Sequence, residues 1–364
     1  MDLNKVRGAL LGSALADAVG LTNRYIYRKT PQSYPYDAPI RKNPPNDWTE
    51  NTDCAVLIAR SATYISRRGA NLIQIEQITD FSREFGVRLS AWTREGFGEL
   101  GDSVGIESKF LTTIAKRIDV DAVMEQSRSG SQQLADPFAA ALAFWEESDR
   151  NFATNAPLVR STPLCALDET RRIPLVIAAC RTTHADPKCV AACLIHTTLC
   201  ALIVRGTPIA HILTETIKCL GALDTAIATP LTSEEMLELS AVLKRAYTQQ
   251  IETFDLGALS RVEHVYSALE CSIWTLQVIR IAETARSTPN FKLIIEHVAA
   301  QGGDAASNCA AVGAVLGAYL GAGALPREWL GAAPNMEWLE RQYDVFLDTV
   351  IRAPVQDYSA TTAL

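Results

Sequence analysis

Apolar residues recur along most of this 364-residue chain at the spacing that buries one face of a helix. After Asp53, for example, Ala55, Ile58, Ala62 and Ile65 fall on one stripe. The spacing predicts helices over residues 3–20, from Asp53 onward, and over 73–87, 108–116, 132–149, 171–183, 187–204, 208–219, 233–249, 261–285, 291–300, 307–322 and 335–351. We find no convincing alternation of the kind that strands show, so the pattern predicts an all-α protein.

Breaks in the helical pattern fall at two longer segments. Residues 21–48 are rich in Pro, Tyr and Asn, and residues 93–107 are rich in Gly, so we expect both to be loops. Long loops without structure of their own are often functional. Since no linker divides the chain, the sequence predicts one compact helical domain over residues 1–352 and a flexible tail over 353–364.

Composition and charge narrow the class of protein. The chain is 48% hydrophobic and 21% charged, as in ordinary globular proteins, and its net charge is −7. An acidic balance argues against nucleic-acid binding, which needs a basic face. No apolar run reaches the roughly 18 uninterrupted residues of a membrane span. Nine cysteines without a CxxC pair are typical of buried thiols in a reducing compartment, so we expect a cytoplasmic protein without a membrane partner.

Five segments place polar residues beside glycines or small-residue helices. They are GSALADAVG at 12–20, WTENT at 48–52, NAPLVRSTPL at 155–164, THADP at 183–187 and GGDAAS at 302–307. Each segment alone has a plain structural explanation, such as a surface carboxylate, a helix N-cap or a turn. Their order and spacing are more specific than any one of them.

Taken together, the five segments resemble those of the ADP-ribosylglycohydrolases, over residues 3–350. The resemblance implies a single compact ADP-ribosylglycohydrolase-like domain that is all-α. It also implies a ligand, either ADP-ribose or an ADP-ribosylated protein. In such enzymes two divalent cations, Mg²⁺ or Mn²⁺, lie under the ADP-ribose while water attacks the anomeric carbon of the ribose.

The resemblance also assigns roles to residues. For catalysis it implies the carboxylates Glu50, Asp304 and Asp17. For metal binding it implies the oxygen-bearing side chains of Thr49, Glu50, Asp304 and Ser307. For ligand binding it implies Asn155, Arg160, Ser161, His184, Gly105, Gly302 and Gly303. The residues themselves leave structural alternatives open, namely an ion pair for Arg160 and a hydrogen-bonded role for His184.

Two of the expected metal-binding carboxylates are missing. Asn51 and Ala306 stand where the family pattern has aspartates, so Glu50 and Asp304 are the two that remain. Two dications facing two carboxylates would repel each other strongly at close range. The sequence therefore predicts one Mg²⁺ or Mn²⁺ at most, or none. Asp53 lies one position away from the expected ligands, where its carboxylate would compensate in part if it pointed inward.

Two hypotheses for function follow, and the sequence leaves open whether the chain is an enzyme. The first is an ADP-ribosylglycohydrolase-type hydrolase with an impaired two-metal site. The second is a catalytically inactive relative that binds ADP-ribose or another protein. A zinc site at Cys189, Cys193 and His196, spaced along one helix, is less favoured than a packed core. The oligomeric state is left open.

Overall fold

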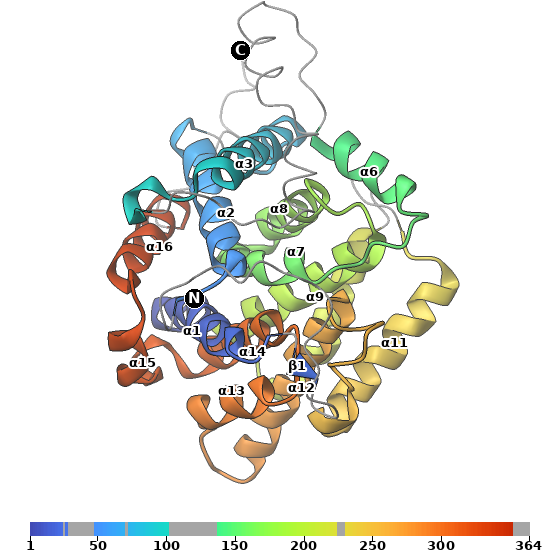
Figure 1. The fold of residues 1–364 in the computed structure, drawn as a ribbon, viewed down its shortest axis with the longest axis vertical. Helices are drawn as coiled ribbons and strands as arrows, with labels where there is room; N and C mark the ends of the chain where they lie inside the picture. The colour runs from blue at the N-terminus through green and yellow to red at the C-terminus, as the bar shows by residue number, and fades with distance from the viewer. Residues whose placement is uncertain (25, 28–46, 70–71, 102–136, 224–229, 352–364) are drawn as a thin grey trace, which may run out of the picture.

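Helices form nearly all the regular structure in the computed structural model, which describes residues 1–24, 26–27, 47–69, 72–101, 137–223 and 230–351 (Figure 1). The helices of the first half are α1 (Leu3–Leu21), α2 (Glu50–Arg67), α3 (Ile75–Glu95), α6 (Pro137–Glu147), α7 (Ala156–Arg160), α8 (Glu169–Arg181) and α9 (Pro187–Val204). Those of the second half are α10 (Ile209–Ile217), α11 (Ser233–Thr248), α12 (Val265–Thr284), α13 (Phe291–Ala299), α14 (Ala305–Leu320), α15 (Arg327–Ala332) and α16 (Met336–Val350). Short 3₁₀ turns are η1 (Gly98–Leu100), η2 (Thr162–Ala166), η3 (Lys218–Leu223), η4 (Ile251–Thr253) and η5 (Ala322–Ala324).

The predicted all-α, single-domain class is confirmed. Several expected helices end within two residues of the observed ones, including α8, α9, α11 and α16. α3 continues to Glu95, well beyond the expected 87, so the start of the predicted glycine-rich loop is helical. The helix expected over 108–116, the remainder of that loop from 102 onward and the tail over 353–364 lie outside the described residues.

One short antiparallel pairing interrupts the helical architecture. β1 (Ile26–Tyr27) pairs with β2 (Gly302–Gly303), with Ile26 opposite Gly303 and Tyr27 opposite Gly302. The hydrophobic pattern did not indicate this pairing, because a two-residue strand is too short to show alternation. The pairing ties the chain just after α1 to the chain just before α14.

α9 lies in the interior of the helical assembly. Among the described helices it alone is long and apolar enough to cross a membrane, and 89% of it is buried inside the protein. A helix that is apolar on every side is typical of the centre of a large core. The contacts of α9 with other helices account for its hydrophobicity.

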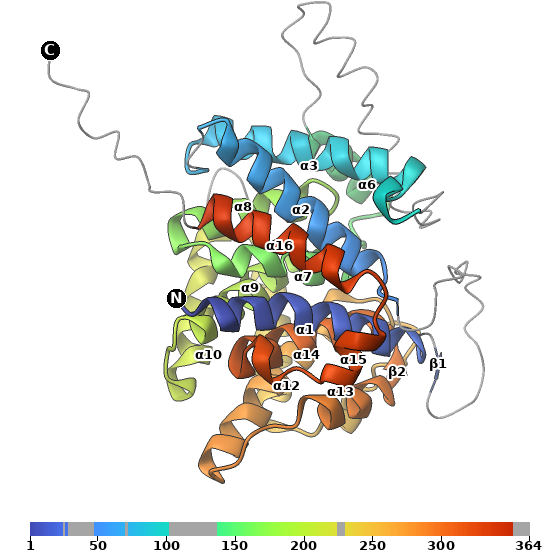
Figure 2. The same cartoon turned by 90° about the vertical axis from the view of Figure 1, so that its left-hand side faces the viewer.

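α1 and α14 cross at very short range, and this contact sets the geometry of the site. Gly8 lies against Gly317 and Gly12 against Gly313, so the two helices run antiparallel. A Cβ built on Gly12 would lie 2.6 Å from the Gly313 carbonyl oxygen, closer than real Cβ atoms approach. α1 also lies between α14 and the α2–α16 pair (Figure 2). The antiparallel crossing brings the end of α1 next to the start of α14.

Candidate functional site

Three chain segments meet where α1 ends and where α2 and α14 begin. Asp17 lies in the last turns of α1, Thr49 is the N-cap of α2, and Asp304 is the N-cap of α14. Gly20 allows the close approach, because a Cβ there would lie 2.8 Å from the Ala306 Cα. These polar side chains are at least 98% buried, so their hydrogen bonds are decisive for the site.

Asp17 ties α1 to the start of α2. Its Oδ1 accepts hydrogen bonds from Thr49 Oγ1 (2.7 Å) and Asn51 Nδ2 (3.2 Å). Its Oδ2 accepts from Thr49 N (2.9 Å), Thr52 Oγ1 (2.8 Å) and Thr52 N (3.3 Å). Burial raises the pKa of Asp17 to about 6, and the bonds from Thr49 and Thr52 oppose that rise. With all these donors directed at it, the carboxylate acts as the anchor of the α2 N-terminus.

The network continues from Asn51 to the start of α14. Asn51 Nδ2 donates to Ser307 Oγ (3.1 Å), and Ser307 Oγ donates to Asp304 Oδ2 (2.7 Å). Asn155 Nδ2 also donates to Asp304 Oδ2 (2.9 Å). Side chains from four distant parts of the sequence therefore form one connected set of hydrogen bonds.

Arg24 forms ion pairs with Glu50 and Asp304, the two acidic residues kept from the expected metal-binding set. Its Nη1 and Nη2 donate to the Glu50 carboxylate (3.2 and 2.5 Å), and its Nε donates to Asp304 Oδ1 (3.0 Å). The Arg24 side chain is 17% exposed, Glu50 16% and Asp304 2%. A partly buried guanidinium that is shared by two carboxylates is a strong, geometrically fixed contact.

The residues predicted to bind ligand occupy several different environments. Gly302 and Gly303 form β2 and have positive φ values of 74° and 67°, and they lead directly into Asp304. Ser161 Oγ lies 2.8 Å from Thr197 Oγ1 on α9, within the core. Gly105 lies outside the described residues. Among the described contacts, Asn155 is hydrogen-bonded to Asp304 and so belongs to the connected set of hydrogen bonds, whereas Ser161 has no contact with that set.

Arg160 and His184 belong to a second buried network. Arg160 Nη2 donates to Thr183 Oγ1 (2.5 Å) and its guanidinium lies over the Phe85 ring. His184 contacts Thr183 Oγ1 through Nδ1 (2.7 Å) and Thr154 Oγ1 through Nε2 (2.6 Å). Burial holds the pKa of His184 well below its usual value, so the ring is neutral near pH 7. The contacts are those of the hydrogen-bonded structural histidine that the sequence left as an alternative.

The residues at this site do not fit a pair of divalent cations. Among the described residues no group of three or more His, Cys, Asp or Glu side chains is placed to hold a metal ion. Glu50 and Asp304 are both ion-paired to Arg24, and Ala306 offers no donor atom. The Asp53 carboxylate, which was a candidate to compensate, accepts a hydrogen bond from Trp48 Nε1 (2.8 Å). Two dications would need more oxygen donors and more negative charge than these residues supply.

The cysteine and histidine residues of α9 are packed in the core. His196 Nε2 lies 3.1 Å from Thr162 Oγ1, and its Nδ1 lies 2.9 Å from Ser272 Oγ. Burial raises the pKa of the Cys189 and Cys193 thiols well above the usual value. Protonated thiols and a histidine bonded to hydroxyls are typical of packing, as the sequence favoured.

The free energy of unfolding should depend on His196 below neutral pH. Burial lowers the pKa of His196 to about 3, whereas an unfolded histidine titrates near 6.5. The unfolded state therefore takes up the proton first, and stability is lost as the pH falls from 6.5 toward 3. From pH 7.5 to pH 5 this residue should account for a loss of about 2 kcal/mol. Urea unfolding at the two pH values measures it.

His196→Gln keeps a donor and an acceptor for Thr162 and Ser272 but removes the titrating ring. The pH-dependent loss should shrink by about 2 kcal/mol in this variant. His211→Gln is the matched control, because His211 is exposed on α10, and it should behave like the wild type. Equal losses in wild type and His196→Gln would show that His196 takes up its proton without unfolding.

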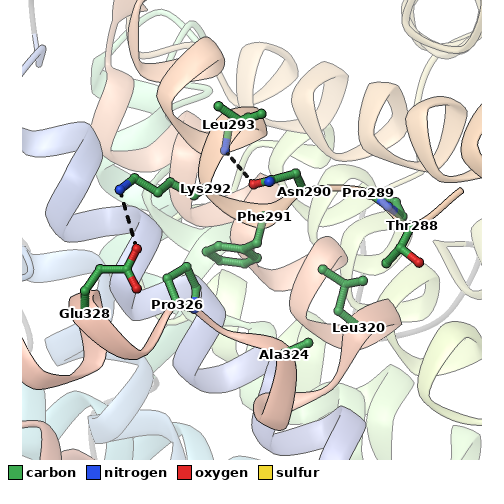
Figure 3. Close-up of a pocket in the computed structure, with 10 residues that line it drawn as sticks. All are labelled: Thr288, Pro289, Asn290, Phe291, Lys292, Leu293, Leu320, Ala324, Pro326 and Glu328. Atoms are coloured by element: carbon green, nitrogen blue, oxygen red, sulfur yellow. Dashed lines mark hydrogen bonds and ion pairs between the residues drawn. The ribbon is translucent and has the colours of Figure 1, made fainter.

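A concave region lies apart from the Asp304 site. It is a hollow of about 550 Å³ between the start of α13, the end of α14 and α15, where Lys292 and Glu328 pair across 3.4 Å (Figure 3). Asn290 Oδ1 caps α13 there by accepting from Leu293 N (3.1 Å). The hollow and Asp304 lie at opposite ends of α14, which spans about 24 Å at the usual helical rise. It is therefore a separate feature.

Sequence reasoning missed two contributors to the site. Arg24 lies in a segment that the sequence indicated only as a loop, and nothing in the spacing of the motifs marks it. Thr52 was part of a recognised motif, but its contact with Asp17 was not expected. A basic residue next to an acid-depleted site is the one signal that would have suggested Arg24.

Comparisons with known proteins concern the family and the fold. The family model described as ADP-ribosylglycohydrolase matches residues 1–356. A solved structure described as "ADP-ribosylglycohydrolase-related protein complex" is similar with a TM-score of 0.60 at 23% sequence identity, covering 96% of this chain and 98% of that one. At this identity the likeness concerns the fold. No curated protein sequence matches the chain.

Proposed function

The chain belongs to the ADP-ribosylglycohydrolase family, and on that premise we propose that it binds ADP-ribose or an ADP-ribosylated protein without two-metal hydrolysis. The binding site would be the region around Asp304. The observation that carries the proposal is the connected set of hydrogen bonds that joins Asp17, Asn51, Ser307, Asp304 and Asn155.

The ends of two helices favour an anionic ligand at this place. α2 and α14 both begin here, with Thr49 and Asp304 as their N-caps. The first N–H groups of a helix lack partners within the helix, and its N-terminus carries a partial positive charge. Gly302 and Gly303 lead into α14, and a diphosphate suits such a position. These features support the choice of ADP-ribose as ligand.

The same site lacks what two-metal hydrolysis needs. Hydrolysis by two metals depends on carboxylates that hold both ions and orient a water molecule. In this chain Asn51 and Ala306 replace two such carboxylates, and Arg24 engages the other two. We therefore propose a binding protein, a catalytically inactive relative of the hydrolases. Buried free thiols at all nine cysteines support a cytoplasmic location.

Thermal unfolding with ADP-ribose tests the binding proposal. A ligand that binds the folded state alone raises its stability by about 2.7 kcal/mol at one hundred times the dissociation constant. We expect a concentration-dependent rise in melting temperature for the wild type, and its loss in Asn155→Ala. Incubation of an ADP-ribosylated protein with Mg²⁺ or Mn²⁺ should release no ADP-ribose, as measured by chromatography.

Asn290→Ala is the control, because it changes an asparagine at the hollow near α13 and leaves the Asp304 site intact. It should keep the full response to ADP-ribose. Loss of the response in Asn290→Ala alone would place the ligand in that hollow. An unchanged wild-type melting temperature would contradict binding, and metal-dependent release of ADP-ribose would contradict the inactive assignment.

A further inference from the structure

We infer that the Arg24 guanidinium takes the place of the metal ions as the cation that holds the starts of α2 and α14 together. The inference rests on contacts within the chain, and it stands whether or not ADP-ribose binds. It predicts that the site keeps its structure without metal ions, because the Arg24 side chain supplies the positive charge.

The geometry of Arg24 matches this role. Its Nη1 and Nη2 face the two oxygens of Glu50, the first residue of α2, and its Nε faces Asp304, the N-cap of α14. A guanidinium is planar and presents its donors in a fixed fork, so it can hold two carboxylates in one defined arrangement. Among the described residues, Arg24 contacts both acidic residues that survive from the expected metal site.

The backbone around Arg24 fixes the direction of the side chain. Arg24 N donates to the Leu21 carbonyl (3.3 Å) as the chain leaves α1. Two residues later, Ile26 pairs with Gly303, the residue that precedes Asp304. Arg24 is therefore held between the end of α1 and the β1–β2 pairing, directly beside the carboxylates.

The charge at the site fits one guanidinium better than it fits two dications. The two described carboxylates that Arg24 contacts, Glu50 and Asp304, supply two negative charges, and Arg24 supplies one positive charge, to which the partial charges of two helix starts add. Two dications would supply four positive charges, and each would be repelled by Arg24 at close range. Positions 51 and 306 carry no carboxylate in this chain. The site is stable without these two carboxylates because the Arg24 guanidinium supplies its cation.

Removing Arg24 should convert the site into one that attracts a divalent cation. Glu50 and Asp304 would then lose the guanidinium that both contact, and both offer oxygen ligands of the kind that Mn²⁺ accepts. Wild-type protein should melt at the same temperature in EDTA and in millimolar MnCl₂. Arg24→Gln should melt several degrees lower than the wild type in EDTA and regain part of the loss in MnCl₂.

Electron paramagnetic resonance of free Mn²⁺ provides a direct count of bound ions. We expect no binding by the wild type and measurable binding by Arg24→Gln. Adding Asn51→Asp to Arg24→Gln should tighten Mn²⁺ binding at least tenfold, because a further carboxylate then joins Glu50 and Asp304. Arg7→Gln is the matched control, since it removes the exposed ion pair of Arg7 with Asp344, and it should bind no Mn²⁺.

Arg24→Lys keeps the positive charge but loses the planar set of guanidinium donors. This variant tests the inference if Arg24→Gln does not fold. It should show native far-ultraviolet circular dichroism, a melting temperature below that of the wild type, and no Mn²⁺ binding. Stoichiometric metal in the purified wild type, or a fall in its melting temperature in EDTA, would overturn the inference. So would a folded Arg24→Gln that binds no Mn²⁺ and melts like Arg7→Gln, or Mn²⁺ binding by Arg24→Lys.

Discussion

Gly313→Ala is expected to lower the free energy of unfolding by at least about 2 kcal/mol. This loss is expected even though alanine in a helix is about 1 kcal/mol more favourable than glycine. The added methyl group would press on the Gly12 carbonyl oxygen and lie 2.5 Å from the Ala16 Cβ. Both are held by the α1 backbone, so relief requires the two helices to move apart. Such a shift would also separate Asp17 from the α14 N-terminus. Chemical unfolding measures the change.

Gly331→Ala is the control for this prediction. Gly331 lies in α15, and nothing lies within 4 Å of a Cβ built on it. The same substitution should stabilise the protein slightly, by up to about 1 kcal/mol, because it restricts the unfolded chain. If both variants were stabilised, the α1–α14 contact would be looser than described.

Asp17→Ala should cost about 4 kcal/mol of stability or more and should abolish the response to ADP-ribose. The substitution leaves five donor groups of Thr49, Asn51 and Thr52 without their buried acceptor. Each buried donor that loses its partner costs about 1–3 kcal/mol, less whatever local rearrangement recovers. Urea unfolding and thermal shift with ADP-ribose test the two parts separately.

Asp2→Ala provides a matched control on the same helix. Asp2 is an exposed N-cap whose carboxylate accepts from Asn4 N and Lys5 N. Its loss should cost about 1 kcal/mol, as for other helix caps, and should leave the ADP-ribose response intact. Equal losses in the two variants would mean that Asp17 acts only as a helix cap.

Much of the fold could be predicted because hydrophobic spacing reflects burial. The limits of α9 follow directly from a run of apolar residues that starts at Pro187. The pattern misplaced the end of α3, because the buried Trp92 extends the helix up to the glycine-rich stretch that indicated a loop. It also missed α7, which is five residues long and too short for helical periodicity. Short elements depend on tertiary contacts that spacing alone does not encode.

The site was predictable in its parts but not in its charge balance. The motif order indicated Asp17, Glu50 and Asp304, and the structure places these residues around one point. Counting carboxylates predicted a deficit of negative charge, yet it gave no sign of the Arg24 ion pairs with Glu50 and Asp304. That contact depends on how the chain turns after α1 and on the β1–β2 pairing. The catalytic, metal-binding and ligand-binding roles assigned from the sequence stay predictions.

The pairing of α1 with α14 has a consequence for how the protein is made. Gly8 meets Gly317, so the glycine-lined face of α1 gains this partner only after the roughly 300 residues between them have been translated. At about 5–20 residues per second, translating the intervening roughly 300 residues takes about 15–60 s. During that interval α1 exposes a flat, small-residue surface.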